Sequence, residues 1–135
     1  MIGDKRKLGY MMRHGKIYVW RGTYAMVRAE RPCRGAVVVI RDRKETTCLV
    51  EEPVTGGRSL LAVDTGWKII TFDMVLPFSL VGFLAKVSAA LAGAEIGICA
   101  LSAYSTDHIL VKARDLEKAL GTLEKLGFAV DRKER

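Results

Sequence analysis

The second half of the chain carries the pattern that most constrains the fold. Two stripes of apolar residues recur at the spacing of an amphipathic helix, and short runs rich in β-branched residues flank them. Over residues 67–130 the predicted order is strand, helix, strand, strand, helix, strand, the split βαβ pattern. Two amphipathic helices in this order can cover one face of an antiparallel sheet. The first stripe is Leu80, Phe83, Leu84, Val87 and Leu91, and the second is Leu116, Ala119, Leu120, Leu123 and Leu126.

The first half repeats this plan in a shortened form. Four β-rich runs are separated by turn-like residues, but the connection around Pro32 is too short for a full helix. We therefore expect an α+β fold of two ferredoxin-like (βαββαβ) halves in tandem. Their sheets are expected to be antiparallel with helices on one face, and the first half lacks a full first helix. The four predicted strands of that half are residues 17–20, 24–27, 36–40 and 46–50.

These patterns predict four segments along the chain. Residues 1–15 are charged and show no periodicity, so we expect a flexible N-terminus. Residues 16–64 form the degenerate half, residues 65–131 the complete half, and residues 132–135 a charged tail. No run of eighteen apolar residues is present, and no apolar segment follows the basic residues near the N-terminus. The sequence therefore predicts a cytoplasmic protein with no membrane partner.

The charge distribution raises an alternative function. The net charge is +7. Residues 1–60 hold 13 Lys and Arg against 6 Asp and Glu, whereas the remaining residues hold 9 of each. A basic half is typical of a nucleic-acid-binding module. However, the strands contain no pair of stacking aromatics in the pattern of an RNA-recognition fold, so nucleic acid is the disfavoured partner.

The motifs of common catalytic and metal sites are missing from the sequence. It has no phosphate-binding glycine loop, no nucleophile elbow and no paired histidines of a zinc protease. The three cysteines, Cys33, Cys48 and Cys99, are far apart and have no histidine nearby. This spacing disfavours a structural zinc site and a disulfide framework. We therefore expect a protein that is not an enzyme and uses no cofactor or metal.

A binding site remains as a hypothesis. Val81, Gly82 and Phe83 stand at the predicted start of the first helix of the second half, where unpaired N–H groups and the helix dipole favour a carboxylate. Gly82 would let a ligand approach the backbone closely, although it could equally serve helix packing. Asp107 lies in a turn between two strands, where aspartate is common for backbone reasons but could also hold an ammonium group.

Short motifs follow one another along the chain. In the second half they are residues 77–82, 91–92, 96–98, 100–102, 106–111 and 116–120, and in the first half residues 22–24, 48–50 and 66–67. The order of these motifs resembles the ACT domain family. The likeness is to its amino-acid-sensing subgroup, which includes cytosolic arginine sensors and small tandem-ACT proteins. It covers about residues 16–130 and is specific in the second half but loose in the first.

The resemblance implies a non-catalytic regulatory or sensor protein. In this family a free amino acid lies at the interface between ACT units. Val81, Gly82 and Phe83 would bind its carboxylate, and Asp107 would face its amine or side chain. Freestanding ACT proteins act through a protein partner, which the sequence does not identify.

We also expect a homodimer, because a small sheet leaves apolar edges and faces to cover. The predicted contact face is Gly97, Cys99, Leu101 and Ala103.

Overall fold

The protein folds into two units that share one long strand. The computed structural model describes the backbone of residues 2–133 and the side chains of residues 5–133. Unit 1 comprises the residues up to Arg21 together with those from Ile69 onward, and unit 2 is Gly22–Lys68. The helices are α1 (Ile2–His14), α2 (Phe83–Gly93) and α3 (Leu116–Leu126). The strands are β1 (Lys16–Val19), β2 (Tyr24–Ala29), β3 (Val38–Arg41), β4 (Thr46–Glu51), β5 (Leu60–Phe72), β6 (Cys99–Ser102), β7 (Asp107–Lys112) and β8 (Ala129–Asp131).

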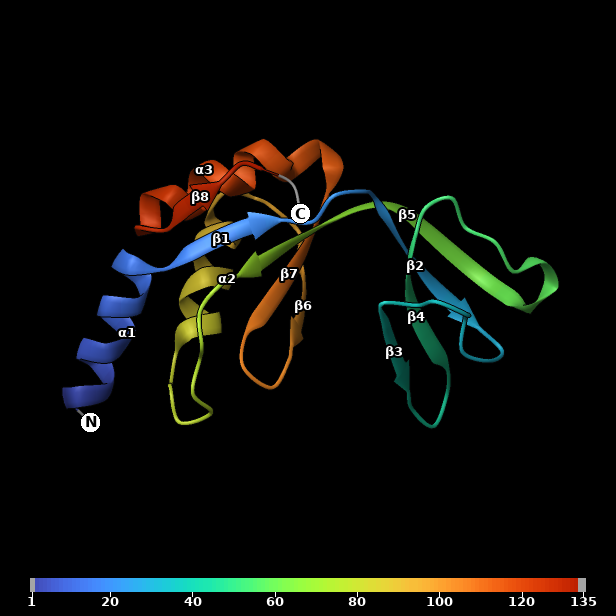
Figure 1. Ribbon diagram of the computed structural model, residues 1–135, viewed down its shortest axis with the longest axis horizontal. Coiled ribbons are helices and arrows are strands. Elements are labelled where there is room, and N and C mark those ends of the chain that lie inside the picture. The colour runs from blue at the N-terminus through green and yellow to red at the C-terminus, as the bar shows by residue number, and fades with distance from the viewer. Residues whose placement is uncertain (1, 134–135) are drawn as a thin grey trace. The chain divides into compact units, whose positions relative to one another are not determined.

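Unit 1 contains a sheet with the strand order β8-β1-β5-β7-β6. The end of β5 runs antiparallel to β1, with Phe72 opposite Ile17. β6 and β7 form an antiparallel pair that begins with Ser102 opposite Asp107. From β5 onward the elements follow the predicted order, strand, helix, strand, strand, helix, strand (Figure 1). The predicted α+β fold is therefore confirmed for this part of the chain.

Helices α2 and α3 pack against each other and against this sheet (Figure 1). Both apolar stripes supply the core, because Phe83, Val87 and Leu91 of α2 are buried, as are Ala119, Leu120 and Leu123 of α3. At the centre, the ring of Phe72 on β5 meets the ring of Phe83 at 5.1 Å and that of Phe128 at 5.2 Å, both edge to face. Such pairs add specific geometry to the burial of large apolar side chains.

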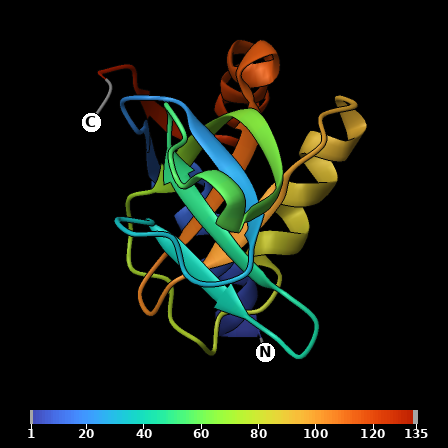
Figure 2. The ribbon, with the colours of Figure 1, turned by 90° about the vertical axis from the view of Figure 1, so that its right-hand side faces the viewer.

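Unit 2 is an antiparallel sheet in the order β3-β4-β2-β5 (Figure 2). One apolar cluster of this unit is formed by the buried residues Ala25, Val27, Ala29 and Cys48. Within its residues 22–68 the only helical segment is a single 3₁₀ turn, Gly57–Ser59. The expected shortening of the first half is thus confirmed, and it goes further than the loss of one helix.

The prediction of a flexible N-terminus over residues 1–15 was wrong. Residues 2–14 form helix α1, and the side chains of Leu8 and Met12 are buried in the core of unit 1. These two residues lie one helical turn apart and so share one face. Gly127 allows the close approach of α1, because a Cβ atom at this position would lie 2.7 Å from the Met12 carbonyl oxygen.

The expected sheet and the expected boundary also need correction. The sheet is mixed rather than antiparallel, because β1 lies between β5 and β8 and pairs in parallel with β8, Lys16 opposite Ala129. The half predicted as residues 65–131 therefore lacks a strand that the N-terminal segment supplies. Of the predicted tail, Arg132 is bound at 2.9 Å to Glu117 and to Glu124 of α3, and residues 134–135 lie outside the described residues.

Strand β6 lies at the end of the strand order of unit 1, and among the described strands its pairing partner is β7, on one edge. The predicted homodimer would use this strand. Leu101 is half-buried and lies opposite His108, whereas Ala100 points to the other face of the sheet.

We expect light scattering at tens of micromolar to give about twice the 14.9 kDa chain mass. Leu101→Lys should give a monomer, and Ala100→Lys should stay dimeric. A monomeric wild-type chain would contradict the prediction.

Candidate functional site

Helix α2 begins where the sequence predicted a binding helix start. Gly82 is the residue before the helix, and its φ of 93° lies in the left-handed region that glycine adopts without strain. The N–H of Lys86 donates to the Gly82 carbonyl oxygen at 3.0 Å, the first hydrogen bond of the helix. The N–H groups before Lys86 in this turn have no intrahelical acceptor. No acidic side chain stands in the first turn, so its positive dipole end is not neutralised locally.

Two loops are tied together beside this helix start. The N–H of Leu76 donates to the Ser105 carbonyl oxygen at 2.6 Å, and the Thr106 hydroxyl donates to the Phe72 carbonyl oxygen. These bonds join the segment before α2 to the turn between β6 and β7. On the outside, the rings of Phe78 and Tyr104 meet edge to face at 5.1 Å. The hydrogen bonds thus hold the loop that precedes Gly82 next to the turn that precedes Asp107.

The result is a groove of about 290 Å³ that brings together three of the four predicted site residues. Gly82, Phe83 and Asp107 line it. Val81 does not, because its exposed side chain lines a separate cavity. The remaining lining residues are mostly apolar: Leu76, Pro77, Phe78, Leu80, Leu84, Ala85, Ser102, Ala103 and Thr106. The groove therefore combines helix N–H donors, one carboxylate and an apolar wall.

His108, the residue after Asp107, belongs to a polar network. Thr71 is buried on β5, and its hydroxyl accepts a hydrogen bond from the Trp20 indole at 2.7 Å. The same hydroxyl lies 2.8 Å from Nδ1 of His108. Burial lowers the pKa of His108, and the neighbouring Asp107 opposes this shift. With a neutral ring, Thr71 can donate to Nδ1 while it accepts from Trp20. Asp107 is the acidic residue among the described residues that line the groove.

Sequence patterns indicated the helix start and Asp107 but missed the residues that connect them. Thr71 stands within an apolar strand and Thr106 within a turn, and neither type is rare at such places. Their importance lies in hydrogen bonds to residues more than thirty positions away. The edge-to-face pair of Phe78 and Tyr104 likewise joins segments that no local pattern links.

The described residues contain neither a cluster suited to a metal ion nor a helix suited to crossing a membrane. No group of three or more His, Cys, Asp or Glu side chains among them is arranged to hold a metal ion. None of the helices in this part of the chain has both the length and the apolarity needed to cross a membrane. The basic residues of the first half are divided, since Lys5, Arg6, Lys7 and Arg13 belong to α1 of unit 1 and others to unit 2.

Comparison with known proteins points to one domain family. Residues 62–125 match the model of the ACT domain. No curated protein matches the chain. Among solved structures, protein Atu0741 from Agobacterium tumefaciens is 25% identical, with a TM-score of 0.77, and the match covers 90% of this chain and 96% of that one. The matched ACT segment runs from β5 into α3 and includes Gly82, Phe83 and Asp107.

Two further structures share the fold at lower identity. Protein VC0802 from Vibrio cholerae, of unknown function, is 18% identical with a TM-score of 0.75, covering 92% of this chain and 98% of that one. The regulatory subunit of aspartate kinase from Thermus thermophilus, in its ligand-free form, is 12% identical with a TM-score of 0.60, covering 83% and 95%. The fold thus resembles the regulatory domains of aspartate kinase, and residues 62–125 of this chain are similar to the ACT domain.

Proposed function

We propose that this protein is a non-catalytic regulatory module that binds a free amino acid in the groove of unit 1. The observation that carries the proposal is the position of Gly82, Phe83 and Asp107 around one groove of about 290 Å³. Pockets for drug-sized ligands span about 300–1,000 Å³, so this groove suits a small molecule. Matches to ACT and aspartate kinase regulatory domains support the same class of function.

The N–H donors and the carboxylate that line the groove suit the two charged groups of an amino acid. The carboxylate would accept hydrogen bonds from the N–H groups of Gly82 and Phe83, helped by the helix dipole. The Val81 N–H stays a predicted third donor. The ammonium group, or a cationic side chain, would pair with Asp107, whose carboxylate has no hydrogen bond within the described residues. The apolar wall would exclude part of the solvent and so strengthen both interactions.

A thermal-shift screen of the twenty amino acids tests this function. A ligand at 100 times its Kd stabilises the fold by about 2.7 kcal/mol. For a domain of this size, that raises Tm by roughly 5–15 °C. We expect at least one amino acid to give such a shift and the Asp107→Asn variant to lose it. No shift above 1 °C with any amino acid would overturn the proposal.

Asp115→Asn is the matched control. Asp115 precedes α3, outside the groove, and its side chain makes no capping hydrogen bond, so this variant should keep the full shift. Gly82 is a poorer probe, because at its φ of +93° any side chain strains the backbone regardless of the ligand. If Asp107→Asn and Asp115→Asn respond alike, the assigned site is wrong even if an amino acid binds.

A further inference from the structure

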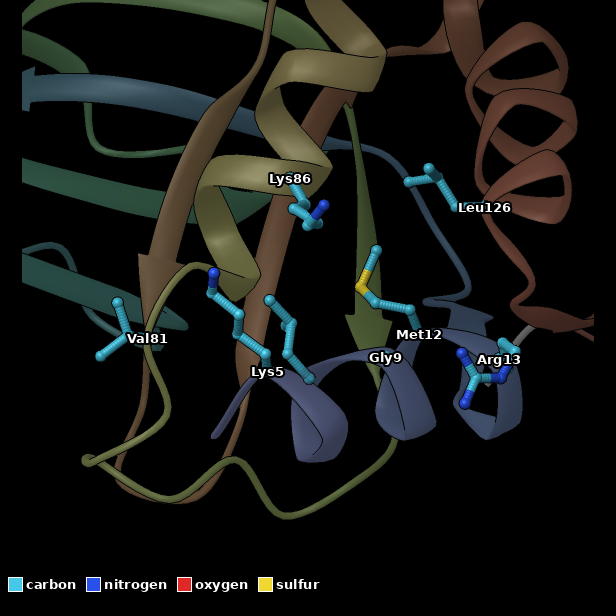
Figure 3. Close-up of a pocket in the computed structure, with 8 residues that line it drawn as sticks. Lys5, Gly9, Met12, Arg13, Val81, Lys86 and Leu126 are labelled. Carbon is cyan, nitrogen blue, oxygen red and sulfur yellow. The ribbon is translucent and has the colours of Figure 1, made fainter. Parts of the chain in front are cut away.

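Unit 1 contains a second, larger cavity that the amino-acid groove does not use. It has a volume of about 730 Å³ and lies among α1, the start of α2 and the end of α3 (Figure 3). Two side chains that line it, Leu8 and Met12 of α1, also belong to the core. Leu8 supports the turn before α2, since a Cβ on Gly82 would lie 3.4 Å from its Cδ2. The floor of this cavity is therefore apolar and held by core packing.

The opposite walls are apolar as well. Val81 projects from the loop before α2, and Leu126 faces the cavity from the end of α3 (Figure 3). Val81 is 74% exposed, so its apolar side chain is available to a bound molecule. An apolar cavity of this size that stays open to solvent is typical of a ligand site.

Three cations surround this apolar surface. Lys5 and Arg13 come from α1 and Lys86 from α2, and the described lining includes no Asp or Glu. In Figure 3, the Lys5 side chain rises from α1 toward the start of α2, where Lys86 lies. The Arg13 guanidinium lies back over Gly9, where a Cβ would be 3.1 Å from its Nη1. Within the described residues, none of the three cations forms an ion pair.

From this arrangement we infer that the cavity binds an amphipathic anion, a carboxylate carried on a hydrocarbon chain. The chain would lie on Leu8, Met12 and Leu126, and the carboxylate would lie among the cations. Each half of such a ligand matches one half of the cavity: the apolar floor favours removal of methylene groups from water, and the cations favour a negative head. A neutral chain would use only the apolar floor, and a short anion would interact only with the cations.

Calorimetric titration of the full chain with decanoate, below its micelle concentration, tests this inference. We expect saturable binding, about tenfold weaker binding of octanoate because two methylene groups are lost, and no measurable binding of acetate. Decyltrimethylammonium has the same chain length and the opposite charge, so it should not bind. Decanol should bind more weakly than decanoate. Equal affinity for all three ten-carbon probes, or binding of acetate as tight as that of decanoate, would overturn the proposal.

A pair of lysine variants locates the site. Lys86→Glu should weaken decanoate binding about tenfold or more, because it replaces an attractive charge with a repulsive one. Lys118→Glu makes the same change on an exposed position of α3 outside the cavity and should change the affinity by less than twofold. Equal losses in the two variants would show a general effect of net charge and would refute the assignment. The Asp107→Asn variant should bind decanoate normally, so this result is independent of the proposed amino-acid site.

Discussion

Replacement of Phe72 by alanine is expected to lower the free energy of unfolding by about 3–5 kcal/mol. Phe72 is fully buried on β5, and its ring meets those of Phe83 and Phe128. Truncation removes the transfer free energy of the ring and leaves a cavity at the point where strand, helix α2 and the segment after α3 meet. Tm should fall by roughly 10–20 °C.

Circular dichroism during heating and urea titration would measure this loss. Phe78→Ala is the matched control, because it removes the same ring from a side chain that is 78% exposed. The variant loses the ring contact with Tyr104 at the surface, so we expect a change in the free energy of unfolding below about 1 kcal/mol. Similar losses in the two variants would contradict the central position of Phe72.

The second large effect concerns Gly127, the residue that ends α3. Its φ is +115°, and a Cβ there would lie 2.7 Å from the Met12 carbonyl oxygen and 3.0 Å from the Arg13 Cα. Gly127→Ala therefore combines backbone strain with a clash against the backbone of α1. We expect a loss of about 3–5 kcal/mol, together with faster amide exchange in α1 as the helix is displaced.

Gly121→Ala makes the same chemical change but is expected to raise the free energy of unfolding rather than lower it. Gly121 lies inside α3, and nothing lies within 4 Å of a Cβ added there. Alanine should stabilise the helix by up to about 1 kcal/mol. If Gly127→Ala proved as harmless as Gly121→Ala, the close contact between α1 and the end of α3 would be refuted.

The parts of the fold that local patterns encode were predictable. The stripes from Leu80 and from Leu116 each supply one face to the core, so both helices were found. Helix α1 was missed because only Leu8 and Met12 of its described residues are buried in the core, which is too few for a visible period. The first part of β5 was missed because its residues are mostly exposed and show no alternation.

Strand pairing could not be read from the sequence. Nothing in residues 16–19 shows that they lie beside residues 129–131, because a parallel pairing between distant segments leaves no local trace. The same limit applies to the candidate site. The glycine at 82 and the aspartate at 107 were found as types at expected places, whereas the cationic cavity was missed together with the helix that forms one side of it.

The connectivity of β1 and β5 has a consequence for the order in which the two units can fold during synthesis. The N–H of Trp20 donates to the carbonyl oxygen of Ile69, so the two ends of the 22–68 segment meet as neighbours on adjacent strands. That segment is contiguous and can close its own sheet as soon as it is synthesised. β1 can form its sheet pairings only after β5 and then β8 have been synthesised, which requires almost the whole length of the chain. We therefore expect unit 1, which contains both cavities, to be completed only after almost the whole chain has been synthesised.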